Sequence, residues 1–109
     1  AAQGGLWGIE EIKNMREREI EAKLKREVEK RGGLYFKFLS SVSGVPDRIL
    51  LFADGFLIFV ELKKEGEKPR KLQEVQMRKI RELGFRVRVV DSEQGIQELM
   101  KEIDGEAEG

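Results

Sequence analysis

The sequence predicts an α/β domain with a central mixed four-stranded sheet flanked by helices, in the order α-β-β-β-α-β-α. Two observations predict it. Three charged segments carry apolar residues at helical intervals: 10–31, 70–83 and 93–103. Four shorter runs are nearly continuously apolar and are bounded by turn-forming or polar residues: 34–39, 48–53, 56–63 and 85–90.

The N-terminal half is predicted to contain one helix and three strands. The helix at 10–31 ends at Gly32-Gly33, and the aromatic run 34–39 is the first strand. A loop of small residues, 40–46, leads to the second strand. Asp54-Gly55 is a two-residue hairpin pattern, so the second and third strands should be antiparallel. Their continuous apolar runs predict a sheet covered on both faces.

The C-terminal half is predicted to contain a crossover unit and a last helix. Pro69 precedes the second helix, whose inner face would carry four apolar residues: Leu72, Val75, Ile80 and Leu83. The fourth strand should then lie parallel to the third through a right-handed connection. Residues 1–109 form a single domain, in which 1–9 and 104–109 are expected to be flexible ends.

Composition removes several classes of function. The chain has no Cys and no His, which excludes disulfides, thiol or imidazole catalysis and Cys- or His-bound metals. Carboxylates, lysines and hard cations bound by oxygen remain. No apolar run is long enough to cross a membrane, and no signal peptide is evident, so we expect a soluble cytoplasmic protein without a membrane partner.

The net charge of zero is a cancellation. Lys+Arg and Asp+Glu both number 21, but residues 62–90 carry ten basic and four acidic side chains. Residues 91–109 carry one basic and seven acidic side chains. The basic segment favours a nucleic-acid partner, although half of its charges could be ordinary solvated helix surface.

Asp47, Glu61 and Lys63 are polar residues at the ends of apolar strands. Glu61 and Lys63 are two positions apart, so their side chains point to the same face. Across a hairpin centred at 54/55, residues whose numbers sum to about 109 should pair, and 47 and 61 sum to 108. The two carboxylates are therefore predicted to lie side by side.

Two adjacent carboxylates repel each other unless a cation or a shared proton joins them. Mg²⁺ or Mn²⁺ suits this arrangement, with Asp47, Glu61 and the Leu62 backbone carbonyl as ligands and Lys63 beside a water or a phosphate. A lone Glu-X-Lys is by itself usually a surface ion pair at a strand end. The hairpin register and the Gly-Val-Pro-Asp sequence before the second strand favour a catalytic site.

Gly44-Val45-Pro46-Asp47-Arg48, the glycine-containing hairpin and Phe59-Val60-Glu61-Leu62-Lys63 together resemble the PD-(D/E)XK nuclease superfamily, and within it the small stand-alone VRR-NUC group. The resemblance runs from about Glu17 to Ser92 and implies a restriction-endonuclease-like fold. It also implies catalytic roles for Asp47, Glu61, Lys63 and Gln73, and a further metal ligand in Glu21, directly or through water. Gln76 is the rival of Gln73, because it lies nearer the centre of the apolar stripe.

Candidate DNA contacts lie around this constellation: Lys37, Ser43, Lys64, Lys68, Arg70 and Lys71. For Lys37 a snorkelling lysine, and for Ser43 a role in loop shape, are equally consistent with the sequence. Trp7 has no assigned role.

The function expected from these residues and the resemblance is a Mg²⁺- or Mn²⁺-dependent, structure-selective DNA endonuclease, a Holliday-junction resolvase acting as a homodimer. A nuclease of flaps or other branched DNA is one alternative. A nucleic-acid-binding module without catalysis, and an acidic-tailed protein-binding module, are the others.

Overall fold

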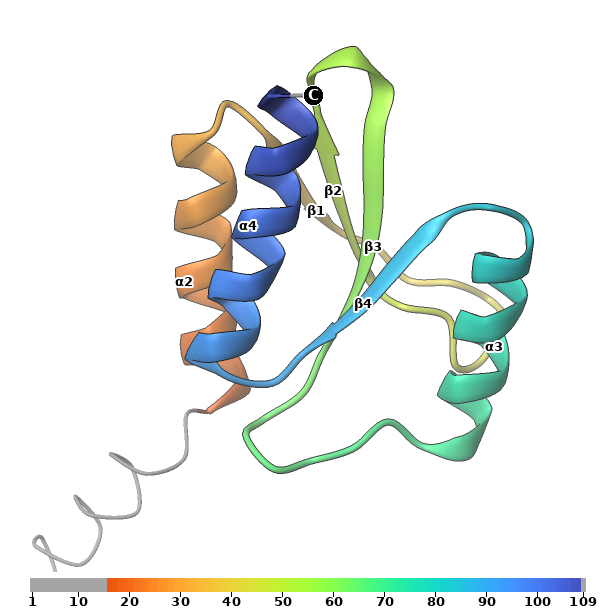
Figure 1. Ribbon diagram of the computed structural model, residues 1–109. Coiled ribbons are helices and arrows are strands. Elements are labelled where there is room, and N and C mark those ends of the chain that lie inside the picture. Colours follow the sequence, from red (N-terminus) through yellow and green to blue (C-terminus); the bar gives the residue numbers. More distant parts are fainter. Residues whose placement is uncertain (1–15, 109) are drawn as a thin grey trace, which may run out of the picture.

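The computed structural model describes residues 16–108 and contains four strands, three α-helices and one 3₁₀ turn in that range. The elements in chain order are α2 (Glu17–Lys30), β1 (Leu34–Lys37), β2 (Arg48–Phe52), η1 (Ala53–Gly55), β3 (Phe56–Leu62), α3 (Lys71–Glu82), β4 (Arg86–Val90) and α4 (Glu93–Glu108). This order confirms the predicted α/β fold (Figure 1). Residues 10–15 of the helix predicted at 10–31 lie outside the described residues. Arg16 is extended, so α2 begins at Glu17 and the prediction is wrong at this position.

The sheet has the strand order β1-β2-β3-β4 and is mixed. β1, β2 and β3 are antiparallel neighbours, and β3 pairs in parallel with β4. Arg48 pairs with Val60, and the same register brings Asp47 opposite Glu61. The predicted hairpin register is therefore correct.

The core lies between the sheet and two helices that run side by side on one of its faces, α2 and α4 (Figure 1). Alternate residues of β3 point into this core and are fully buried or nearly so: Ile58, Val60 and Leu62. They pack against apolar residues of both helices, among them Ile20, Leu24, Ile96 and Met100. The residues between them on β3, including Glu61, consequently face the opposite side of the sheet.

α3 lies on that opposite side, against β4 (Figure 1). It buries Gln73 and Met77, whereas Leu72 and Leu83 are 50 % and 78 % exposed, so the predicted inner face is wrong at these two positions. α3 packs mainly against β4, so only a narrow face of the helix is covered, and that face carries Gln73 and Met77. β1 stays uncovered on this side, which leaves Leu34 and Phe36 about half exposed and corrects the prediction of a sheet covered on both faces.

Two further boundaries differ from the predictions. The β2–β3 connection has three residues, Ala53–Gly55, because Phe52 pairs with Phe56 and both Asp54 and Gly55 adopt positive φ. The C-terminal helix continues through 104–108 instead of ending at Ile103. Ion pairs hold this last part in place, from Arg31 to Asp104 and from Arg86 to Glu106. None of the helices within 16–108 has the length and apolar character needed to span a bilayer.

Candidate active site

Asp47 and Glu61 form an acidic pair at one end of β2 and β3. Glu61 is only 7 % exposed, whereas 39 % of the Asp47 side chain is accessible. Burial raises the pKa of Glu61, and the neighbouring charge of Asp47 raises it further, which outweighs the opposing effect of Lys63. The predicted pair therefore exists, and its two carboxylates repel each other.

Lys63 lies beside this pair although it is just as buried as Glu61. Its Nζ is 3.8 Å from Glu61 Oε2 and 3.5 Å from Glu67 Oε1. The backbone N–H of Lys63 donates to the Val90 carbonyl, which fixes the residue just beyond the end of β3. The buried ammonium lies between Glu61 and Glu67, so it places a fixed positive charge beside the acidic pair.

Gln73 connects the acidic pair to α3. Its Nε2 donates to Glu61 Oε2 at 3.1 Å, and its Oε1 accepts the backbone N–H of Arg70 at 2.8 Å. The second bond is the reach of an N3 side chain back to the helix N-cap. Both ends of the amide are therefore engaged, and it is Gln73 rather than the partly buried Gln76 that contacts Glu61.

Gly44 brings the loop before Asp47 against the start of α3. Its φ is +87°, and a Cβ at this position would lie 2.8 Å from the Leu72 carbonyl oxygen. Only glycine combines this conformation with such a close approach. The contact holds the loop that leads to Asp47 beside Leu72, the residue before Gln73.

Comparison with known proteins places this arrangement in a family. A protein named "Putative nuclease p44", from Acyrthosiphon pisum secondary endosymbiont phage 1, is 44 % identical over 80 residues, which are 72 % of this chain and 86 % of the relative. A solved structure described as a VRR_NUC domain superimposes with a TM-score of 0.75 and 31 % identity, covering 78 % of this chain and 94 % of the other. The chain belongs to the VRR-NUC family of nucleases. A scan against family sequence models gave no match.

Glu21, which the VRR-NUC resemblance implies as a further metal ligand, is bound to two neighbouring side chains. Its Oε2 accepts hydrogen bonds from Arg48 and from the Tyr35 hydroxyl. Within residues 16–108, no three Asp, Glu, His or Cys side chains are placed to hold one metal ion directly. The role of Glu21 as a metal ligand, directly or through water, stays a prediction. The Glu21 carboxylate supplies a counter-charge to the buried guanidinium of Arg48.

Glu17 is a residue that the sequence analysis passed over. It is exposed in the first turn of α2, and its charge contributes to the raised pKa of Glu61. Glu17 therefore lies close enough to affect the acidic pair. Glu17 lies one helical turn before Glu21, toward the end of α2 that is nearer the site. That spacing is the sequence pattern that could have identified Glu17.

The donor set of this VRR-NUC site fits a hard divalent cation. Asp47 and Glu61 destabilise each other, and a cation between them would relieve that repulsion. Mg²⁺ is commonly held by one or two carboxylates and completes its shell with water and substrate phosphate. Two side-chain carboxylates are therefore sufficient.

The basic side chains separate into two groups. Arg86 and Arg88 of β4 are paired with Glu106 and Glu102 of α4, so the acidic tail neutralises part of the basic segment. The candidate DNA contacts are all exposed: Lys37, Ser43, Lys64, Lys68, Arg70 and Lys71. Lys64 and Lys68 lie in the loop after β3, and Arg70 and Lys71 lie at the start of α3, next to Gln73.

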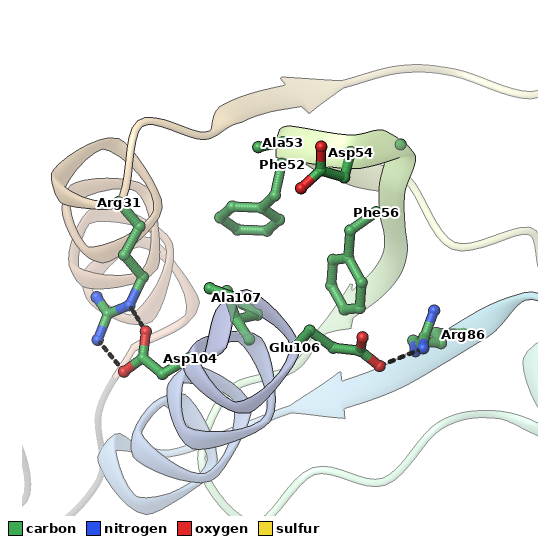
Figure 2. Close-up of a pocket in the computed structure, with 11 residues that line it drawn as sticks. Arg31, Phe52, Ala53, Asp54, Phe56, Arg86, Asp104, Glu106 and Ala107 are labelled. Carbon is green, nitrogen blue, oxygen red and sulfur yellow. Dashed lines mark hydrogen bonds and ion pairs between the residues drawn. The ribbon is translucent and has the colours of Figure 1, made fainter. Parts of the chain in front are cut away.

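A cavity of about 540 Å³ lies at the hairpin end of the sheet, away from the acidic pair. Figure 2 shows the rings of Phe52 and Phe56 lining it, between the β2–β3 connection and the last turn of α4. Arg31 is bound to Asp104 at 2.7 Å, and Arg86 is bound to Glu106 at 2.5 Å and stacks 4.5 Å over Phe56. Because these pairs balance both cations, the cavity offers no unpaired arginine to a substrate.

Proposed function

We propose that this VRR-NUC nuclease is a metal-dependent, structure-selective DNA endonuclease that acts as a homodimer on four-way (Holliday) junctions. The observation that carries the proposal is the acidic pair, Asp47 and Glu61, held together with Lys63 and Gln73 at one end of the sheet. The arrangement needs neither His nor Cys, and the chain has neither.

Asp47, Glu61 and the Leu62 carbonyl would hold Mg²⁺ or Mn²⁺. When bound, the ion supplies positive charge that stabilises the transition state of phosphodiester hydrolysis. Lys63 adds a second, fixed charge against a phosphate oxygen or the attacking water. Gln73 holds the Glu61 carboxylate in one orientation, so that little rearrangement is needed when the substrate arrives.

Exposed basic side chains flank the site, and they suit contacts with phosphates better than contacts with bases. They are Lys37, Lys64, Lys68, Arg70 and Lys71. Ser43, on the loop before Asp47, adds a hydroxyl donor. Contacts of this kind read the path of the backbone, which supports selection of DNA by shape. A junction has a two-fold arrangement of strands and one chain carries one acidic pair, which favours a dimer. The exposed Leu34 and Phe36 offer apolar surface for such association.

The function is tested by offering labelled four-way junction, flap, duplex and single strand to the protein with Mg²⁺, Mn²⁺ or EDTA. We expect metal-dependent cutting of the junction, and a loss of at least about 10²-fold in Lys63→Ala and Asp47→Ala. Asp54→Asn, which removes an exposed carboxylate at the hairpin tip, should retain full activity. Light scattering should give twice the chain mass of 12.6 kDa.

Four results would count against the proposal. Cutting in EDTA would contradict a metal-dependent mechanism. Cutting by Lys63→Ala at the wild-type rate would contradict a catalytic role for Lys63. Preference for flap over junction leaves a nuclease but removes the resolvase function. Retention of DNA without cutting of any substrate indicates a binding module.

Gln73→Ala is expected to lower the cutting rate about 10- to 100-fold, because Glu61 then loses the donor that orients it. Gln76→Ala is the matched control, since it removes the same amide from the same helix without touching Glu61, and should cut at nearly the wild-type rate. Single-turnover rates at saturating Mg²⁺ make the comparison. Equal losses in both variants would mean that α3 stability, and not Glu61, explains the effect.

A further inference from the structure

Arg48 is a buried arginine directly after Asp47 in the chain. It is 3 % exposed, and it is the first residue of β2. Arg48 points to the face of the sheet that α2 covers, where its side chain meets Tyr35 and Glu21. A guanidinium is seldom buried without a specific function or a full set of partners.

Two partners hold one side of this guanidinium from the α2 face. Arg48 Nε donates to the Tyr35 hydroxyl at 2.8 Å and to Glu21 Oε2 at 2.9 Å, and Nη2 also donates to Glu21. The Tyr35 hydroxyl itself donates to Glu21 at 3.1 Å. Burial by itself raises the pKa of Glu21, but the bonds from Arg48 and Tyr35 outweigh it, so the pKa is lowered and the carboxylate stays charged.

The other side of the guanidinium faces the acidic pair. Arg48 Nη1 lies 2.5 Å from Asp47 Oδ1, out of line for a hydrogen bond. Among the described residues, Arg48 Nη1 is the one buried side-chain nitrogen or oxygen atom without a hydrogen-bond partner. The positive charge of Arg48 also opposes the rise in the pKa of Glu61, so its field reaches both carboxylates. Buried donors are normally satisfied, and an unsatisfied one beside a functional carboxylate needs an explanation.

We infer that Arg48 is a positioning residue for Asp47. Glu21 and Tyr35 fix the guanidinium from the α2 side, and its Nη1 then restrains the Asp47 carboxylate in the orientation that binds the cation. This inference rests on the proposed function, because it takes Asp47 to be a metal ligand. It also gives Glu21 a role, which is to anchor Arg48.

The alternative is that Arg48 simply competes with the cation for Asp47. The two explanations differ in sign. Coulomb's law alone requires that removal of a neighbouring positive charge strengthen cation binding. Loss of a residue that orients a metal ligand instead weakens metal binding, typically about 10- to 100-fold.

The experiment measures Mn²⁺ binding without DNA, by electron paramagnetic resonance of free Mn²⁺ and by the metal-dependent rise in melting temperature. The variants are wild type, Arg48→Met, Tyr35→Phe and the control Arg88→Met. Arg88 on β4 is also an ion-paired arginine, bound to Glu102 at 2.5 Å, and its removal changes the net charge equally. We expect Arg48→Met to bind Mn²⁺ about 10- to 100-fold more weakly than Arg88→Met.

Tyr35→Phe removes one anchor of Arg48 without any change of charge, and should weaken Mn²⁺ binding about 3- to 10-fold, the size of one hydrogen bond. This variant decides the matter if circular dichroism shows that Arg48→Met is unfolded. Binding by Arg48→Met that is equal to or tighter than binding by Arg88→Met, or unchanged binding by a Tyr35→Phe tested alone, overturns the inference. Failure of the wild type to bind Mn²⁺ is a different result, which removes the proposed metal site itself.

Discussion

Glu61→Gln is expected to abolish cleavage and at the same time to raise the melting temperature by a few degrees. The charged form of Glu61 is unfavourable in the folded protein, because the side chain is buried and lies next to Asp47. Glutamine keeps its size and can still accept the hydrogen bond from Gln73, but it removes the repulsion. The same change removes a proposed metal ligand, so we expect cutting to fall by at least about 10³-fold. Differential scanning calorimetry and a single-turnover assay test the two effects.

The stability difference between Glu61→Gln and wild type should depend on pH in a defined direction. The pKa of Glu61 is raised in the folded state, so its ionisation costs stability as the pH rises through the folded-state pKa. The variant should therefore be the more stable protein at pH 7, and the difference should disappear below the ordinary glutamate pKa of 4.5. Asp54→Asn serves as the control for loss of a carboxylate at an exposed position. A variant less stable than wild type at pH 7 would contradict the electrostatic explanation.

Added Mg²⁺ should reverse the order of stability, so that the wild type becomes more stable than Glu61→Gln. The wild type gains stability from any ligand that binds only the folded state, whereas Glu61→Gln should gain little. A cation that stabilises both proteins equally would indicate binding elsewhere.

Gly44→Ala should lower activity about 100-fold while the protein remains folded. The new methyl group would lie 2.8 Å from the Leu72 carbonyl oxygen, so either the loop or α3 must shift. A displacement of this size separates Asp47 from Gln73, and misplacement by about 1 Å can cost about 10²-fold in rate. Activity is measured at saturating Mg²⁺, and folding by circular dichroism.

Gly32→Ala is the matched control for this substitution. Gly32 also has a positive φ, +74°, but no atom lies within 4 Å of an added Cβ. Both variants should lose about 1–2 kcal/mol of stability through the left-handed backbone. Only Gly44→Ala should lose activity. Equal losses of activity in both variants would mean that general instability explains the effect.

The sequence determined the order of the elements and the position of the acidic pair. Helical and strand periods are local properties, so α3 and all four strands were located to within a few residues. The predicted helix at 10–31 is interrupted at Arg16, which is extended, so α2 begins at Glu17. A hairpin fixes the register of the strands that it joins, and this was enough to set Asp47 opposite Glu61 and to direct Lys63 to the same face.

Packing between distant parts of the chain determined the partners of the remaining polar groups. The face of α3 that is covered depends on its packing against β4, so the apolar stripe alone placed Leu72 and Leu83 on the wrong face. Glu21 is held by Arg48, 27 positions away, and α4 continues past Ile103 because Asp104 binds Arg31, 73 positions away. Periodicity carries no information about such contacts, since they form only when separate elements dock and their buried charges require partners.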